Sequence, residues 1–445
     1  MILVVVAIVV NIGLEALPLF GGASAGEVEP MGPAPTALAA GTDPRRELVW
    51  TLDRDGLVRL DRGDEPFSIV EEGRRLVAAD HEIHGLLSGL TDDGTVVIGQ
   101  VRFRDQWTDD VRSTSARWRS AADQISLPAD TAWLGVTATA DPDGAVVAAA
   151  WTDAGDLFVA DWDADDEEWE TRQTALGIAG VSSVAIAEDL GSLALIDATG
   201  GLRVFDLPDL AEAVIDAAPA RATAVRFLIG GGTLVVGGDD GSLDVMLEVP
   251  RVRVENRSER VLRIAGTTIE AGDAAELPDD QLGQALASRP DIELTPAASV
   301  WRTIRRMPPM PAAAQVIAPA HRRRGLLVGG EDGSVGLYYS TSGRQLLLDS
   351  WSGDPVEFAS LSPKGDGAIV LAGDRLLGRS IDNPHPEISF RTLFLPVGSE
   401  GVAAPKWVWQ TTGGSDACDP KMSLWPLIFG SLIATLYALV FWVPL

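Results

Sequence analysis

The sequence predicts an all-β protein: a β-propeller of about seven WD-like blades with a small α/β insertion, flanked by an N-terminal and a C-terminal transmembrane helix. Three observations lead to this prediction. Residues 47–400 consist of short apolar runs separated by Gly-containing turns. Some of these turns recur at a period of about 40 residues, which is typical of four-stranded propeller blades. Both ends of the chain are long apolar segments with almost no charge.

The N-terminal segment, residues 1–20, reads MILVVVAIVVNIGLEALPLF and carries one charge, Glu15. A helix of this length spans about 30 Å, the thickness of a bilayer core. We therefore expect a transmembrane helix. A cleaved signal peptide is the alternative, because Ala23-Ser24-Ala25 fits the small-residue cleavage pattern. The lack of a basic start, together with Glu15 and Pro18 late in the run, favours the anchor.

The C-terminal segment, residues 423–445, reads SLWPLIFGSLIATLYALVFWVPL and has no charge. Its length and hydropathy predict a second transmembrane helix, with Trp425, Tyr437 and Trp442 suited to the lipid–water interface. A buried core helix is the alternative. Because the sequence stops within this apolar run, we expect it to be the front part of a longer protein. If both ends enter the membrane, the region between them lies on one side of it.

Hairpin signals define the blades. Segments 90–100 (LTDDGTVVIGQ), 234–245 (LVVGGDDGSLDV) and 326–338 (LLVGGEDGSVGLY) share an acidic-Gly turn between apolar strands, a strong hairpin pattern. Divergent copies are expected at Asp55-Gly56, Asp143-Gly144, Thr199-Gly200-Gly201 and Gly373-Asp374. Gly201 and Gly241 are 40 residues apart, as are Gly333 and Gly373, whereas Gly241 and Gly333 are 92 apart. Six to eight blades result, with seven as the central prediction.

The 92-residue gap predicts an inserted module. Residues 251–298 begin with a hairpin pattern and continue as a short capped helix and a closing strand, so we expect a small α/β module grafted between blades. Pro- and Gly-rich residues 21–46 are expected to be a flexible linker, and residues 401–422 a second linker that returns to the membrane.

Composition excludes several function classes. The formal net charge is −29, which argues against a nucleic-acid binder and against a protein held on anionic lipid by charge. Cys418 is the only cysteine, so neither an intramolecular disulfide nor a thiolate metal site is possible. The sequence contains no Walker loop. We therefore predict neither an enzyme nor a bound cofactor or metal.

Four motifs could carry chemistry, and each has a simpler interpretation. Gly22-Ala23-Ser24-Ala25-Gly26 matches the nucleophile elbow of hydrolases but lacks the strand–helix context. Asp161, Asp163 and Asp165 alternate as in a calcium loop, but the required Gly and Glu are missing, so a solvated loop is expected. His81-Glu82-Ile83-His84 has the wrong spacing for a zinc protease. Two arginine groups, residues 322–324 and Arg302, Arg305 and Arg306, are expected to form charge pairs, with a docking patch as the alternative.

Both ends of the chain resemble one known family. Residues 15–20 (EALPLF), 408–413 (VWQTTG) and 419–432 (DPKMSLWPLIFGSL) are similar to long-form permease subunits of bacterial phosphate ABC transporters, over about a tenth of the chain. The resemblance implies the inner membrane, with the bulk of the chain outside the cytoplasm. It also implies three partners: a second permease subunit, a cytoplasmic ATPase and an extracytoplasmic phosphate-binding protein. Pathway residues would lie beyond Leu445, so none can be assigned.

The sequence thus leaves three functions open. The first is the N-terminal part of a phosphate importer permease whose propeller docks or regulates a protein partner. The second is an envelope-anchored propeller that acts as a protein-binding scaffold or sensor. The third is a secreted propeller enzyme with carboxylates at its channel. The first is favoured by the resemblance at the two ends.

Overall fold

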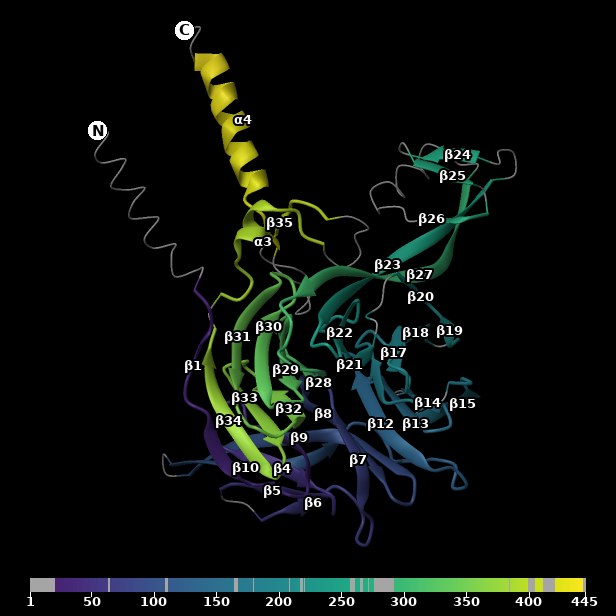
Figure 1. Ribbon diagram of the computed structural model, residues 1–445, viewed down its shortest axis with the longest axis vertical. Helices are drawn as coiled ribbons and strands as arrows, with labels where there is room; N and C mark the ends of the chain where they lie inside the picture. The colour runs from purple at the N-terminus through teal and green to yellow at the C-terminus, as the bar shows by residue number, and fades with distance from the viewer. Residues whose placement is uncertain are drawn as a thin grey trace, which may run out of the picture.

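The computed structural model describes residues 21–442 except 63–64, 109–110, 164–166, 179, 208, 217–218, 220, 257–260, 265–266, 271, 276–291, 384, 399–404 and 411–420. The described chain forms a seven-bladed β-propeller (Figure 1). This confirms the predicted all-β class and the central prediction for the blade count. The segment predicted as the first transmembrane helix lies outside the described residues.

The first three blades follow the chain without interruption. Blade 1 contains β3 (Ala37–Thr42), β4 (Val49–Asp53), β5 (Leu57–Leu60) and β6 (Phe67–Ser68). Blade 2 contains β7 (Leu76–His81), β8 (Leu86–Thr91), β9 (Thr95–Thr108), β10 (Val111–Ser120) and the short β11 (Ile125–Ser126), with the one-turn helix η2 (Ile83–Gly85) between its first two strands. Blade 3 contains β12 (Trp133–Ala140), β13 (Val146–Thr152), β14 (Asp156–Asp163) and β15 (Glu168–Ala175).

The next three blades include the insertion. Blade 4 contains β16 (Ser183–Ile186), β17 (Ser192–Ile196), β18 (Leu202–Asp206) and β19 (Ala211–Glu212). Blade 5 contains β21 (Ala222–Phe227), β22 (Thr233–Gly238), β23 (Leu243–Asn256) and β27 (Ile292–Met307), with β20 (Val214–Asp216) and β26 (Ala274–Ala275) at its edges. Blade 6 contains β28 (Ala314–Pro319), β29 (Gly325–Gly330), β30 (Ser334–Tyr339) and β31 (Arg344–Ser350).

Blade 7 joins the two ends of the domain. Its inner strands are β32 (Val356–Leu361), β33 (Gly367–Ala372) and β34 (Arg375–Asp382), and its outer strands are β1 (Ser24–Ala25) and β2 (Glu29–Pro33). The expected linker over residues 21–46 is therefore wrong, because this segment closes the ring and supplies the first strand of blade 1. Its prolines are tolerated because β2 is an edge strand, where a missing N–H costs no ladder bond.

The insertion lies within blade 5 rather than between two blades. Strands β23 and β27 pair from Leu243↔Met307 to Asn256↔Ile292, with a break in register between Val249 and Arg251. Beyond this break the ribbon leaves the blade and leads to the hairpin of β24 (Val261–Ile264) and β25 (Thr267–Glu270) (Figure 1). The helix predicted within residues 251–298 falls on residues that the structure does not describe.

Each pair of neighbouring blades encloses its own apolar cluster. The second strand of a blade is covered on both sides, which is why β17 (SLALI) and β33 (GAIVLA) are buried at every position and do not alternate. Among the described residues, the largest fully buried side chain is Trp301, which packs edge-on against Phe227 within blade 5. Stability is therefore distributed over the ring instead of residing in one central core.

Glycines with positive φ close the hairpin between the second and third strands of every blade. These residues are Gly56, Gly94, Gly155, Gly200, Gly241, Gly333 and Gly373, with φ between 56° and 85°. Blade 3 uses Gly155, so the sequence-based choice of Asp143-Gly144 is wrong. That pair instead forms the turn between the first two strands, β12 and β13. Gly144 directly follows Asp143, whereas Gly155 follows Ala154, so the Asp-Gly signal marked the turn that joins the first two strands.

The chain leaves the propeller through a short helical segment. Helix α3 (Phe390–Phe394) is followed by the two-residue strands β35 (Trp409–Gln410) and β36 (Lys421–Met422) and then by α4 (Trp425–Trp442), which projects from the body (Figure 1). Among the described residues, the structure contains no helix with both the length and the apolar character needed to span a membrane. The short strands β35 and β36 lie within residues 401–422, where a linker was expected, whereas α3 lies at the end of the region predicted as propeller.

Candidate functional site

The first strands of the seven blades form a closed ring around the propeller axis, from β3 through β7, β12, β16, β21, β28 and β32 back to β3. All turns between first and second strands therefore lie at one end of the ring. We call this end the inner-turn face. The His84–Glu188 contact and the pocket described below lie at this face.

Three ionisable side chains from blades 2 and 5 meet inside the ring, close to this face. Arg226 on β21 forms an ion pair with Asp80 on β7, and its Nε lies 3.7 Å from Oε1 of Glu82. The Thr137 hydroxyl on β12 donates to the same Glu82 oxygen at 3.3 Å. These contacts join blades 2, 3 and 5 through the interior of the ring.

Burial controls the ionisation of this group. Burial raises the pKa of Glu82 to about 8, although the Arg226 charge opposes the rise. For Arg226, burial lowers the pKa, but Asp80 and Glu82 outweigh this and hold the pKa above its ordinary value. The buried arginine links two blades, and the ionisation of each group in this cluster depends on the charges of its neighbours.

A second polar contact lies at the inner-turn face. Nε2 of His84 in η2 lies 2.8 Å from Oε1 of Glu188, and the Gly230 N–H donates to Oε2 of Glu188 at 2.7 Å. His84 has a φ of 67°, which is uncommon for a residue other than glycine. The turns of blades 2, 4 and 5 are thus held together by one carboxylate.

Beside this contact lies a pocket of about 390 Å³ at the inner-turn face. It draws on blades 1, 2, 6 and 7, and its polar lining includes His81, His84, His321, Gln100, Arg102 and Arg322. Three of the four histidines of the chain therefore meet in one cavity. None of the described residues that line it is Asp or Glu, although the sequence contains 64 acidic residues.

Two of these histidines are held in the neutral form. Burial, the neighbouring His321 and Arg226 lower the pKa of His81 to about 3. Burial, His84 and Arg322 lower the pKa of His321 to about 4. The His81 ring also lies 6.1 Å from the Trp50 ring and 6.0 Å from the Phe358 ring, measured between centroids. The pocket therefore offers neutral imidazoles next to two cationic arginines.

An arginine-rich ribbon continues from the pocket. Strands β9 and β10 pair with Arg117 opposite Arg102 and Arg119 opposite Gln100. Residues two apart on a strand point to the same side, so Arg102, Arg104, Arg117 and Arg119 share one face of this ribbon, and all four are exposed. We call these four residues the arginine face. Val101, Phe103 and Trp118 on the opposite face pack against the cluster between blades 1 and 2.

The arginines singled out in the sequence have different environments. Arg302 pairs with Asp216 and Arg306 with Asp244, both at 3.1 Å. Arg305 and Arg324 are buried and donate to Ser340 O and to the Thr233 hydroxyl, respectively. Arg322 lines the pocket. Charge pairing, the favoured interpretation, therefore applies to Arg302 and Arg306.

The two remaining motifs do not line this pocket. Ser24 lies in β1, paired with Asp382 of β34, and no helix follows it. Asp161 on β14 forms an ion pair with Arg172, while Asp165 lies outside the described residues. Within the described part of the chain, no three His, Cys, Asp or Glu side chains converge on a possible metal site. Sequence reasoning missed the arginine face, although its signal is visible as the alternation in VRFRDQ and ARWRS.

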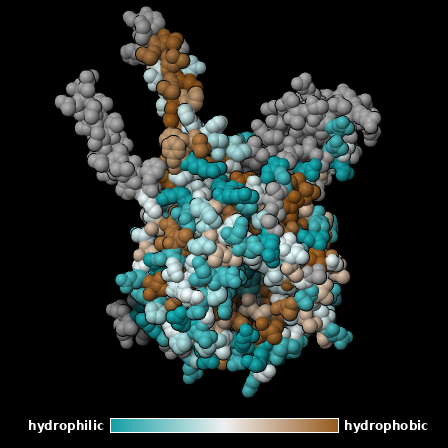
Figure 2. Space-filling view, viewed as in Figure 1, coloured by the Kyte–Doolittle hydropathy of each residue, from teal (hydrophilic) through white to brown (hydrophobic). Residues whose placement is uncertain are grey.

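A second surface surrounds the base of α4. The indole N–H groups of Trp407 and Trp425 both donate to the Phe394 carbonyl, at 3.3 and 2.8 Å. Phe390 and Trp409 are exposed beside them, with Phe390 at 68%. We call these five residues the aromatic collar. Above it, α4 exposes apolar side chains along its length, and Figure 2 shows the helix as a hydrophobic column on a mainly hydrophilic body.

Both chain exits are tied together near the collar. Arg344 at the start of β31 donates to the Ile388 carbonyl at 2.7 Å and to the Gly21 carbonyl at 2.8 Å. One side chain thus fixes the last residues before α3 next to the first described residue.

The chain matches no protein-family model and no curated protein.

Proposed function

We propose that the chain is the N-terminal part of the membrane permease subunit of an ATP-driven phosphate importer, and that its propeller is an extracytoplasmic docking or regulatory domain. Helix α4 carries the proposal. It exposes Leu427, Phe429, Leu432, Leu436 and Val440 among other apolar residues and has no polar face. A helix that is apolar on all sides requires an apolar environment, either lipid or other apolar helices.

The aromatic collar supports an interfacial position for the base of this helix. Tryptophan gathers at membrane–water boundaries because its ring is apolar while its N–H needs a polar partner. Trp407 and Trp425 satisfy their N–H groups on one backbone carbonyl and keep ring surface exposed. In the proposal, α4 is the described part of the span predicted over residues 423–445.

The position of the two exits supports a shared side of the membrane. Because Arg344 holds Gly21 and Ile388 together, segments that continue from both exits start at one side of the body. This matches a propeller inserted between the first and second membrane helices, the arrangement that the resemblance implies. The implied partners are a second permease subunit, a cytoplasmic ATPase and an extracytoplasmic phosphate-binding protein in the bacterial inner membrane.

An envelope-anchored scaffold or sensor unrelated to transport is the second candidate function. The acid-free pocket and the arginine face favour it, because a rigid ring with a charged docking face can bind a protein partner without a transport pathway. Both functions share the membrane anchor, and they differ in which proteins the chain binds.

A membrane test addresses the anchor. Leu432→Arg combined with Leu436→Arg places two charges on α4, and each is expected to cost about 2.5–3.5 kcal/mol of insertion free energy. We expect the wild-type chain to remain with membranes after an alkaline carbonate wash and the double variant to be released. The control is Arg54→Gln, in an exposed turn of blade 1, with Arg253→Gln, on the exposed ribbon that β23 and β27 form beyond blade 5. Release of the wild-type chain by the wash would contradict the anchor.

A proximity test addresses the importer. Cross-linking from the collar, through a photoreactive residue at Trp409, is expected to capture a permease subunit. Cross-linking from the propeller surface is expected to capture the phosphate-binding protein. Mass spectrometry identifies the products. Capture of envelope proteins with no transporter component, in membranes that contain the importer, would replace the first function with the second.

A further inference from the structure

We propose that the arginine face and the adjoining pocket form one docking site for an acidic, extended segment of a protein partner. This inference deepens the proposed docking function by assigning the surface and the chemistry of the partner. The site consists of Arg102, Arg104, Arg117 and Arg119 with Arg322 across the pocket.

Charge is the first argument. The chain carries a net charge of −29, and many of its arginines pair with carboxylates, as in Arg203–Glu212 and Arg379–Asp349. None of the four residues of the arginine face forms an ion pair among the described residues. Arg102 and Arg117 even lie directly opposite each other, an arrangement of like charges that destabilises a sheet. An external anionic group would relieve this repulsion.

The pocket is the second argument. It places Arg102 and Arg322 around imidazole and amide groups, and no carboxylate from the described part of the chain lines it. The Gln100 amide donates to the His84 carbonyl at 3.3 Å, which fixes the start of the arginine face against the pocket wall. A carboxylate in this pocket would meet two guanidinium groups, the side chains best suited to bind it.

Shape and position identify the occupant as a polypeptide. The arginines follow two strands, with successive side chains on one strand about 6.5 Å apart, so they present a line of charges and not a single point. Strand β10 is also the outermost strand of its sheet, where an extended segment could lie alongside. Charged residues can protect an edge strand from unwanted pairing, but that role does not require an acid-free pocket.

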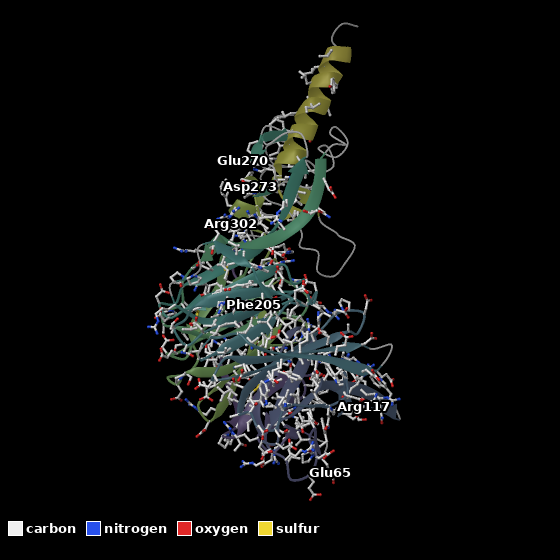
Figure 3. The ribbon with its side chains drawn as sticks, turned by 90° about the vertical axis from the view of Figure 1, so that its right-hand side faces the viewer. Glu65, Arg117, Phe205, Glu270, Asp273 and Arg302 are labelled. Atoms are coloured by element: carbon white, nitrogen blue, oxygen red, sulfur yellow. The ribbon has the colours of Figure 1, made fainter. Side chains whose placement is uncertain are left out.

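Distance from the collar argues against a lipid headgroup. Figure 3 shows Arg117 on a ribbon that projects sideways from the half of the body remote from α4. With α4 directed into lipid, this ribbon faces the aqueous compartment. The site is therefore accessible to a soluble protein or to a soluble domain of a membrane partner.

The test uses the full chain in detergent and a fluorescein-labelled peptide of ten alternating Glu and Ser residues. Fluorescence anisotropy at 20 mM salt is expected to show saturable binding that weakens at 300 mM salt. Arg102→Gln with Arg117→Gln is expected to weaken binding by about fivefold, the effect of losing two exposed ion pairs. Arg322→Gln is expected to weaken it through the pocket.

The matched control removes the same charge elsewhere. Arg54→Gln with Arg253→Gln is expected to leave peptide affinity within about twofold of wild type, and the thermal unfolding midpoint of each variant verifies folding. Equal loss in the control and the test variant, or no binding at 20 mM salt, would overturn the site. Displacement of the peptide by millimolar inorganic phosphate would show a small-anion site instead. Stronger binding to vesicles containing anionic lipid would show a membrane surface.

These outcomes are separate from the anchor test. A chain that stays in the membrane but does not bind the peptide refutes the docking site alone. A chain that binds the peptide but is released by carbonate refutes the anchor alone.

Discussion

The interior of the ring and the arginine face use the same side chain in opposite ways. Arg226 is enclosed between Asp80 and Glu82 and joins distant blades, whereas Arg102 and Arg117 face solvent and have no carboxylate partner among the described residues. The charge of the buried arginine is paired within the chain, so Arg226 is not available to bind a ligand. The exposed pair contributes little to folding and retains its full capacity to bind an anion. Four substitutions would break or sharpen this contrast.

The largest effect is expected for Arg226→Met. It leaves Asp80 in the interior without its counterion, and breaking a buried pair in this way costs about 3–5 kcal/mol of unfolding free energy. Chemical denaturation at pH 7 measures the loss. Adding Asp80→Asn and Glu82→Gln to the same chain should recover much of it, because no unpaired charge is then buried. Equal stability of Arg226→Met and wild type would contradict the pairing.

Glu82→Gln tests the raised pKa. The folded-state pKa of about 8 lies above the ordinary value of 4.5, so the fold favours the protonated acid. Wild type therefore loses stability relative to Glu82→Gln as pH rises from about 4.5 to about 8, by a few kcal/mol at about 1.4 kcal/mol per pKa unit. Denaturation midpoints at pH 5 and pH 8 measure the change. A difference that is constant between these pH values would show that Glu82 ionises normally.

His321→Gln tests the lowered pKa of a pocket histidine, for which stability changes with pH in the opposite sense to Glu82. The folded-state pKa of about 4 lies below the ordinary 6.5, so the stability that neutral His321 contributes is present above pH 6.5 and is lost as pH falls through 4. The loss amounts to at most about 3 kcal/mol. We expect the acid sensitivity between pH 6.5 and 4 to decrease in this variant, as measured by thermal unfolding. His385→Gln, outside the pocket, is the control and should keep the wild-type slope.

The smallest effect is expected for Arg117→Gln, and it has the opposite sign to Arg226→Met. Removing one of two like charges that face each other across β9 and β10 should stabilise the fold by a few tenths of a kcal/mol. Differential scanning calorimetry at low salt resolves such a change, and high salt should abolish it. A marked loss of stability would show that Arg117 is structural, and would leave the contrast between the two regions without support.

Much of the propeller could be predicted from local signals. Asp-Gly turns such as Asp93-Gly94 and Asp332-Gly333 mark hairpins because a positive φ favours glycine, and their spacing yields the period. The same signal failed at Asp143-Gly144, since it marks a turn without saying which strands it joins. The segment 21–46 was misjudged because its prolines and glycines suit both a linker and an edge strand. Its pairing with β34 depends on residues more than 340 positions away.

The sequence by itself determined the all-β class, the repeated hairpins and the apolar character of both ends, because these depend on residue type and on spacing along a few tens of residues. Tertiary structure alone decided how the ring closes, where the insertion leaves blade 5 and which charges meet. The pairing of Arg226 with Asp80 and the gathering of three histidines in one pocket arise from blades far apart in the chain. No local pattern encodes such contacts, since they exist only once the ring has brought those blades together.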